Sequence, residues 1–358
     1  MEVDQSVERM IEIKLIQDDA EVIMSLMKSE RDPIFSLAIL PYYSLFVQSC
    51  QEYLGNIFLE EDYANQVKNI RNYIKAFDIG LAKSKRRVDD VDSEQDNKFS
   101  TMLRFGFMKS WNIHCNLGIY WTKDKHAVGN TQMYADFLGV ENMNNDATKE
   151  KMQNLGYNMG SFVASIKAGF EQAVSPAIVD RALIGTTINY YCDLNTNRKN
   201  NFFIANDKDL SLYCLNLVCN MNFVRYILTP LFAGTNAWIF RIEYVVTYYT
   251  YKALCRLKNY CENNDDLVID MDALSGAIHL DDDIFQSKFR NCMMHYGLQK
   301  QGVLSLDNIE KPLFGMIETC FDGMDFCIYQ LKLREFETRM IKYLESYFNT
   351  EEITIQKL

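Results

Sequence analysis

The sequence predicts an all-α protein built as a multi-helix bundle. Of its 358 residues, 48% are hydrophobic and 24% are charged, a balance typical of a globular protein with an extensive core. Five prolines and sixteen glycines are few for this length, and they leave little turn chemistry for many short strands. Apolar residues recur at helical spacing along most of the chain. We therefore expect long helices, arranged in one large domain or in two.

Three helices are expected in the first part of the chain. Helical spacing of apolar residues predicts the first over residues 3–29. Asp32-Pro33 ends that pattern, and Pro33 suits the first turn of a second helix, which we expect to be kinked at Pro41. A third helix is expected over residues 63–83.

The next segment is predicted to alternate between loops and helices. Residues 89–98 are polar and acidic, so we expect a loop there and a further helix over 101–117. The signal weakens between 121 and 129, before a short helix over 132–138 and a polar connector. This connector is the candidate boundary between an N-terminal helical domain of residues 1–140, whose role the sequence does not indicate, and a C-terminal helical domain of residues 146–358.

The C-terminal half carries the strongest helical patterns. Ser175-Pro176 is a typical helix start, with Ser175 as the N-cap, and an Asn-rich loop is expected over 193–207. The final helical region is expected to break near Gly323. The helices expected in this half cover residues 147–173, 175–191, 208–228, 235–261, 284–296 and 311–348.

Charge and cysteine usage restrict the class of protein. The net charge of −11 and the pI of about 5.0 argue against a general nucleic-acid coat protein, because phosphate binding is driven by basic surfaces. The basic run 83–87 is followed at once by aspartates and is interpreted as a solvated helix end. Ten scattered cysteines without a Cys-x-x-Cys pair, and an opening Met-Glu-Val-Asp-Gln unlike a signal peptide, predict reduced thiols in a cytoplasmic protein. Charged residues interrupt the apolar region 215–251, so no membrane span is expected.

Most candidate sites have a simpler interpretation. The four histidines lack the spacing of a metal site, and the glycines form no phosphate-binding loop, so we expect no metal and no cofactor. Aspartates 281–283 are expected to cap a helix rather than to bind a metal. His114 and Cys115 are adjacent on a predicted helix and would point about 100° apart, which does not suit a nucleophile and its base.

The helix predicted over residues 235–261 combines aromatic residues with two charges. Its aromatic series at helical spacing is expected to lie in the core rather than to stack on nucleic-acid bases. Arg241 and Glu243 lie in the same apolar stretch and need partners if they are buried. They either form a polar site inside the bundle or pair with other segments of the chain.

The remaining candidate is the segment 289–297, which reads Phe-Arg-Asn-Cys-Met-Met-His-Tyr-Gly. Arg290 and His295 are separated by four residues, and the polar Asn291 follows the arginine directly. This pattern resembles the HEPN superfamily, whose helical bundles carry an Arg-x4–6-His signature. The resemblance covers the motif helix and, by helical layout, residues 208–348. It implies a HEPN-like C-terminal bundle packed on the N-terminal helical domain.

The resemblance also implies a chemistry, namely metal-independent RNA cleavage through a cyclic phosphate. In that reaction His295 would transfer protons, since imidazole titrates near neutral pH. Arg290 would hold the non-bridging phosphate oxygens and offset the charge that develops on them. Asn291 would orient either the phosphate or the imidazole. The expected partner is therefore an RNA substrate.

Helix geometry restricts how such a site could be built. Five residues along a regular helix rotate a side chain by about 140°, so Arg290 and His295 would not share a face. Either the helix ends before His295, or another copy of the protein completes the site. Related HEPN proteins place two motifs together across a dimer interface, and this chain has one good motif, so we expect a homodimer.

Two functions are compatible with the sequence. The first is a HEPN-type endoribonuclease, acting as a toxin or defence effector and restrained in some HEPN systems by an inhibitory protein partner. Tyr296 directly follows His295, which departs from the His-x-Tyr arrangement of one toxin subgroup and puts membership of that subgroup in doubt. The second is a non-catalytic helical interaction or scaffold protein, in which Arg290 and His295 are structural residues of a polar helix end.

Overall fold

A computed structural model of the chain describes most of its residues. The described ranges are 5–29, 33–55, 61–101, 114–139, 146–169 and 188–358, the last without residues 199, 206, 233–235, 265–266, 282 and 299–300. Within these ranges the protein is a multi-helix bundle with one small sheet, so the all-α prediction is confirmed. The helix predicted to start at Ser175, and most of the one predicted over 101–117, lie outside the described residues.

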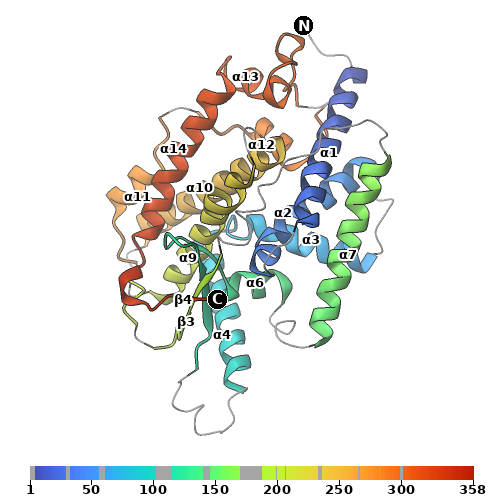
Figure 1. Cartoon of the computed structure of the whole chain (residues 1–358). Helices are drawn as coiled ribbons and strands as arrows, with labels where there is room; N and C mark the ends of the chain where they lie inside the picture. Colours follow the sequence, from blue (N-terminus) through green and yellow to red (C-terminus); the bar gives the residue numbers. More distant parts are fainter. Residues whose placement is uncertain are drawn as a thin grey trace.

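Three helices from the first half of the chain form one side of the molecule. They are α1 (Gln5–Lys28), α2 (Pro33–Leu54) and α7 (Asp146–Gly169). In Figure 1 the dark-blue α1 and the green α7 run side by side, and α2 packs against both. Of the described helices, α2 alone is long and apolar enough to span a membrane, but 72% of its most apolar window is buried inside the protein. That burial is typical of a core helix.

Helices α3 (Glu61–Asn72) and α4 (Leu81–Thr101) correct the prediction for this region. The third helix ends earlier than expected and passes through a 3₁₀ turn, Tyr73–Lys75, while the loop expected over 89–98 is wrong because α4 is continuous there. Asp92 explains the difference. Its buried carboxylate accepts hydrogen bonds from Asn116, Gln132 and Thr196 and pairs with Lys208 at 2.9 Å. A polar helix face can be buried where distant side chains satisfy it.

Four short strands form an antiparallel sheet that the sequence did not indicate. They are β1 (Leu117–Trp121), β2 (Ala127–Asn130), β3 (Tyr190–Leu194) and β4 (Gln356–Lys357), in the order β2-β1-β3-β4. The helices expected to end at residues 117 and 191 are therefore wrong at those ends, because these residues are extended. The short helix expected over 132–138 is present as α6 (Thr131–Leu138), and Asn130 caps it by accepting a hydrogen bond from the Met133 backbone N–H at 2.9 Å.

The second half forms a helical bundle around α10. Helix α9 (Lys208–Asn222) continues as a π-helical turn, Phe223–Leu228, and α10 (Ala237–Asn263) lies at the centre of the molecule (Figure 1). Against α10 pack α11 (Met271–Ala277), which the sequence did not indicate, α12 (Ser287–Met294) and α14 (Phe326–Glu345), while α13 (Met316–Cys320) packs on α12 and α14. The chain breaks between α13 and α14 at Gly323, as predicted, where the positive φ of 83° suits glycine.

The core joins the two halves of the chain. Buried side chains from residues 1–140 and from residues 146–358 belong to one apolar cluster, in which α1 packs against α10. The aromatic residues of α10 that were expected in the core are buried there or packed against it: Trp238, Phe240, Tyr244, Tyr248, Tyr249 and Tyr251. The N-terminal helices therefore pack extensively on the C-terminal bundle.

The buried charges of α10 pair with other segments. Arg241 forms an ion pair with Asp19 of α1, and Glu243 accepts a hydrogen bond from Arg334 of α14 at 2.8 Å. Glu337 lies close to Glu243, and burial together with that neighbouring charge raises its pKa to about 8. These charges therefore fasten α1 and α14 to α10.

Candidate functional site

The predicted motif lies on the short helix α12 and just beyond its end. The helix ends at Met294, two residues earlier than predicted, and His295 has extended backbone angles, with φ −138° and ψ 160°. The His295 backbone N–H still donates to the Asn291 carbonyl at 2.9 Å, which closes the last turn. Of the two alternatives, that the helix ends before His295 or that another copy completes the site, the first is observed. The 140° rotation of a regular helix therefore does not fix the direction of the His295 side chain.

Side chains from two other helices hold the end of α12. Ser49 of α2 donates to the Met294 carbonyl at 2.6 Å, and Arg241 of α10 donates to the Met293 carbonyl at 3.4 Å. These bonds satisfy carbonyls that a helix end leaves without intrahelical partners. Arg241 also lies 4.3 Å from the centre of the Tyr296 ring. The residues on both sides of His295 are thus fixed by the core.

Tyr296 connects the motif to a buried carboxylate. Its hydroxyl donates to Asp19 at 2.6 Å, and Asp19 is also the ion-pair partner of Arg241. Burial raises the pKa of Asp19 to about 6, although Arg241 and the hydrogen bond from Tyr296 both act to lower it. The Tyr that follows the motif histidine therefore has an anchoring role in the core.

A carboxylate orients the imidazole of His295. Its Nδ1 lies 3.0 Å from Oε2 of Glu52 at the end of α2, and Gln48 donates to the other oxygen of Glu52 at 2.9 Å. Burial lowers the pKa of His295, whereas the charge of Glu52 opposes that change. With Nδ1–H donated to Glu52, the neutral ring presents the lone pair of Nε2. The His295 side chain is 42% exposed, so solvent and ligands can reach the imidazole.

Arg290 lies partly exposed beside two tyrosines of α10. Its guanidinium carbon is 5.7 Å from the centre of the Tyr248 ring, and burial raises the pKa of Tyr249 while the charge of Arg290 opposes that rise. The Arg290 Nε is buried, and within the described part of the chain it has no hydrogen-bond partner. Asn291, the next residue on α12, is also partly exposed. Arg290 therefore keeps donor capacity for a ligand.

Two further cations complete this region, and both come from the N-terminal half. Arg71, at the end of α3, is 6% exposed, and Lys75 lies in the turn that follows. Burial lowers the pKa of Lys75, and the charges of Arg71 and Arg290 lower it further. We call Arg71, Lys75 and Arg290 the cationic cluster. The sequence did not identify Arg71 or Lys75, because no local pattern indicates that these cations come within electrostatic reach of Arg290.

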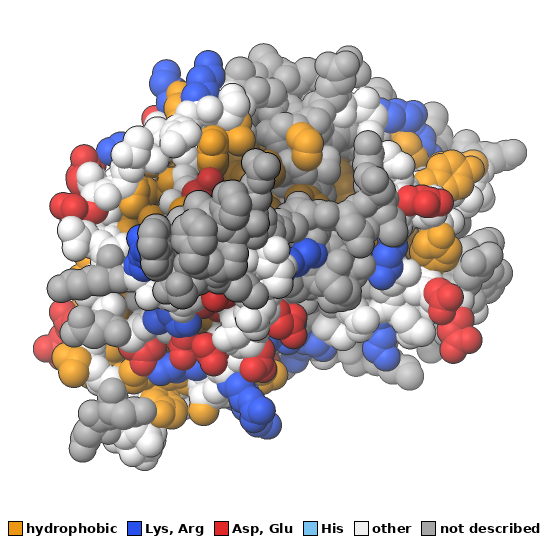
Figure 2. Space-filling model, turned by 90° about the horizontal axis from the view of Figure 1, so that it is seen from below, with side chains coloured by type: hydrophobic (Ala, Val, Ile, Leu, Met, Phe, Trp, Pro, Cys, Tyr) orange, Lys and Arg blue, Asp and Glu red, His pale blue; other side chains and the backbone are white. Residues whose placement is uncertain are grey.

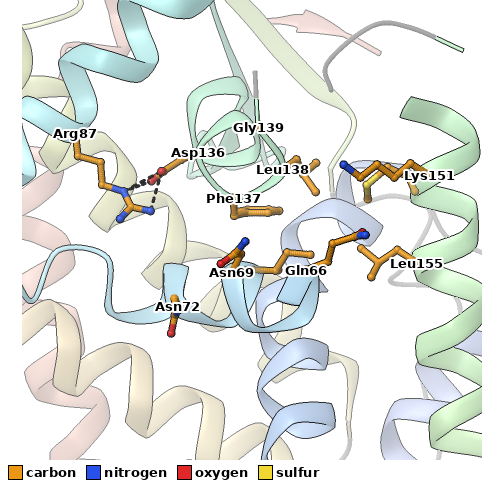
Figure 3. Close-up of a pocket in the computed structure, with 12 residues that line it drawn as sticks. Gln66, Asn69, Asn72, Arg87, Asp136, Phe137, Leu138, Gly139, Lys151 and Leu155 are labelled. Atoms are coloured by element: carbon orange, nitrogen blue, oxygen red, sulfur yellow. Dashed lines mark hydrogen bonds and ion pairs between the residues drawn. The ribbon is translucent and has the colours of Figure 1, made fainter. Parts of the chain in front are cut away.

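A separate hollow lies on another side of α3. It has a volume of about 480 Å³ and is bounded by α3, α6 and α7. Figure 3 shows Gln66 and Asn69 of α3 facing Phe137 and Leu138 across this space, with Lys151 on the opposite wall. None of the predicted site residues Arg290, Asn291 and His295 lines it, so it is distinct from the motif.

The aspartates 281–283 do not act as predicted. Helix α12 begins at Ser287 without a side-chain cap, so Asp281 and Asp283 do not cap it, and Asp282 lies outside the described residues. Asp281 instead pairs with Arg339 of α14 at 2.9 Å and lies 3.5 Å from His279. Among the described residues, no group of three His, Cys, Asp or Glu side chains is arranged to hold a metal ion.

The surface agrees with the acidic composition. On the face shown in Figure 2, acidic and basic side chains alternate over the described area instead of gathering into one basic patch. Binding of a nucleic acid there would lack the broad positive field of a coat protein. A phosphate contact on this face would therefore have to be local.

Comparisons of the chain with protein-family models, with curated proteins and with solved structures found no match. A function for this protein therefore has to be argued from its own residues and their geometry.

Proposed function

We propose that the protein is a HEPN-type, metal-independent endoribonuclease in which Arg290, Asn291 and His295 are catalytic. The observation that carries this proposal is the end of α12, where His295 leaves the helix and is oriented by Glu52. A histidine whose Nδ1 is bonded to a carboxylate, with Nε2 available, is the usual arrangement of a general base. Arg290, which four residues separate from His295, supplies a cation.

The proposed reaction begins at the ribose 2′-hydroxyl. Nε2 of His295 takes the hydroxyl proton, the 2′-oxygen forms a bond to the adjacent phosphorus, and the bond from phosphorus to the 5′-oxygen breaks. The products are a 2′,3′-cyclic phosphate and a 5′-hydroxyl. Arg290 binds the non-bridging oxygens as their charge grows, and Asn291 adds an amide donor beside it. Because burial lowers the pKa of His295, its ring is mainly in the base form at neutral pH.

The leaving 5′-oxygen needs a proton, which a second motif supplies in the proposed assembly. We place two copies of α12 across a twofold axis, so that His295 of the partner subunit, in its protonated imidazolium form, delivers that proton. Twofold symmetry brings the same surface patch of both chains together. A mass measurement that finds a strict monomer at working concentration would contradict this composite site. Such an enzyme suits a cytoplasmic toxin or defence effector restrained by an inhibitory protein.

A second candidate is a non-catalytic helical interaction protein. It is favoured by the contacts that His295 makes with Glu52 and that Arg290 makes with Tyr248, because both could serve the fold alone. The two candidates differ in what the loss of His295 does. A structural His295 would change stability and leave no nuclease activity to lose.

The test is cleavage of a mixed RNA substrate in the presence of a chelator. We expect the wild type to cleave and His295→Ala to lose at least a hundredfold in rate, since general acid–base groups contribute about 10²–10⁴-fold. His279→Ala is the matched control, because His279 is a histidine with a side chain that is 68% exposed and that pairs with Asp281. Equal rates for the wild type and His295→Ala, or no cleavage by either, would remove the nuclease proposal.

A further inference from the structure

The cationic cluster concentrates positive charge where three segments meet. Arg71 lies at the end of α3, Lys75 lies in the turn after it, and Arg290 lies on α12. The turn and α12 both pack against α10, and the charges of Arg71 and Arg290 both lower the pKa of Lys75, so the three side chains lie within electrostatic reach of one another. The charges of Arg71 and Arg290 also act on the same hydroxyl, that of Tyr249. Residues from both halves of the chain therefore make up the cluster.

The two arginines have donors that the protein leaves unused. Arg71 is more than nine-tenths buried, and its Nη1 donates to Asn72 at 3.4 Å, but its Nε has no partner among the described residues. The Arg290 Nε is also buried and has no hydrogen-bond partner among the described residues. Buried donors are normally satisfied, and a guanidinium has no means of losing its charge near neutral pH. Two such guanidinium groups, close enough for the charge of Arg290 to lower the pKa of Arg71, indicate that a ligand supplies the acceptors.

The carboxylates that act on the cluster are engaged elsewhere. Glu52 is bonded to His295 at 3.0 Å, and Asp78 pairs with Arg256 at 2.6 Å. Arg256 therefore offsets the charge of Asp78, and Glu52, whose partner His295 is neutral, is left as one negative charge for three cations. Three cations thus face a region with less negative charge than they need, which favours the binding of an anion.

We infer that Arg71, Lys75 and Arg290 form a binding site for a single phosphate group, and that in the ribonuclease this group is the phosphodiester of the RNA backbone. Two guanidinium forks and one ammonium approach from separate segments, which suits a tetrahedral oxyanion with several acceptor oxygens. A carboxylate ligand would offer two oxygens in one plane. The phosphodiester that Arg290 holds is thus gripped by Arg71 as well, so the N-terminal half contributes directly to substrate binding.

This inference rests on the proposed function for the identity of the ligand, but the phosphate site can be tested without any cleavage. The probes are inorganic phosphate and a single-stranded oligonucleotide in which every sugar is 2′-deoxy, since that strand lacks the attacking hydroxyl. Binding is measured by calorimetry and by fluorescence anisotropy, at two or more salt concentrations. The variants are Arg71→Gln, Arg71→Lys and Arg290→Gln. Lys68→Gln on α3 and Lys288→Gln on α12 are matched controls that each remove one cation from the same helices.

We expect saturable phosphate binding by the wild type and at least tenfold weaker binding of both probes by Arg71→Gln and Arg290→Gln. The controls should stay within about twofold, and Arg71→Lys should bind better than Arg71→Gln because it keeps the charge. The slope of log K against log salt should fall by about 1 for each lost phosphate contact. Arg71→Lys also guards against misfolding of the glutamine variant, and circular dichroism of each variant checks the fold.

Several outcomes separate the inference from the proposed function. Phosphate binding that depends on Arg71, together with no RNA cleavage, would support the site and overturn the nuclease. RNA cleavage with oligonucleotide binding that is unchanged in Arg71→Gln would support the nuclease and overturn the site. The absence of saturable phosphate binding by the wild type, or equal weakening by Lys68→Gln and Arg71→Gln, would also overturn the inference.

Discussion

Replacing Arg241 with methionine should destabilise the protein strongly and in a pH-dependent way. The change keeps the apolar stem of the side chain but removes the partner of Asp19, whose carboxylate is fully buried between α1 and α10. It also removes the donor to the Met293 carbonyl at the end of α12. Removing one member of a buried ion pair costs about 3–5 kcal/mol, because the other charge is left in the interior.

The protonation of Asp19 limits this loss at low pH. In the wild type, burial already raises the pKa of Asp19 from 3.8 to about 6 with Arg241 in place. The folded protein therefore binds an extra proton between those values, and its stability falls as the pH rises through about 6. Without Arg241 the pKa of Asp19 must rise further, and each unit adds about 1.4 kcal/mol to the cost above that pKa. The full loss of about 3–5 kcal/mol is thus expected near pH 8, and a smaller one near pH 5.

The assay is urea denaturation followed by circular dichroism at pH 5 and pH 8, for the wild type, Arg241→Met, Asp19→Asn and the double variant. The double variant should be more stable than Arg241→Met at pH 8, since it carries no buried charge. A free energy of unfolding within about 1 kcal/mol of the wild type at both pH values would refute this reasoning, because typical exposed pairs contribute that little. A loss equal at both pH values would show that Asp19 does not titrate as described.

Three further predictions concern single carboxylates. In urea denaturation, Glu337→Gln should be as stable as the wild type near pH 5 and more stable than the wild type near pH 9. The reason is that the folded-state pKa of about 8 for Glu337 makes the wild type lose stability as the pH rises from 4.5 through 8. Equal curves at pH 9 would contradict this. Glu52→Gln should lower the pKa of His295 in an NMR titration, since the charge of Glu52 raises it, and an unchanged titration would show that the contact is absent in solution. Asp92→Asn should cost about 2–4 kcal/mol by denaturation through the loss of its charged bonds, including the one to Lys208, and a cost below 1 kcal/mol would be inconsistent with that network.

Local periodicity predicted the parts of the fold that local interactions determine. The helices expected over 208–228 and 235–261 were confirmed within a few residues at each end, because their apolar faces are continuous. Helix α4 was missed because its buried face includes Asp92, whose partners lie far away in the sequence. The strands were missed for a similar reason. Each has five residues or fewer, and β3 pairs with β4 at the other end of the chain.

In the candidate site, too, the residues of a local motif were predicted and those brought in by distant segments were not. Arg290, Asn291 and His295 were found because they form a local motif, and the geometry of a regular helix correctly raised the question of where α12 ends. Glu52, Arg71 and Lys75 could not be found in this way. They approach the motif only because the end of α2 reaches the end of α12 and the turn after α3 packs on α10, and no spacing in the sequence encodes those contacts. The roles of the motif residues in catalysis stay predictions until activity is measured.

The chemistry of the product ends tests the nuclease proposal most directly. An RNA oligonucleotide with a single cleavable position is incubated with the wild type, His295→Ala and His279→Ala in chelator, next to the same strand with one 2′-deoxy sugar at that position. We predict a 2′,3′-cyclic phosphate and a 5′-hydroxyl from the wild type and from His279→Ala, and no product from His295→Ala or from the 2′-deoxy strand. Cleavage of the 2′-deoxy strand, a 5′-phosphate product, or an intact substrate in every reaction would contradict the assignment of His295 as the base that activates the 2′-hydroxyl.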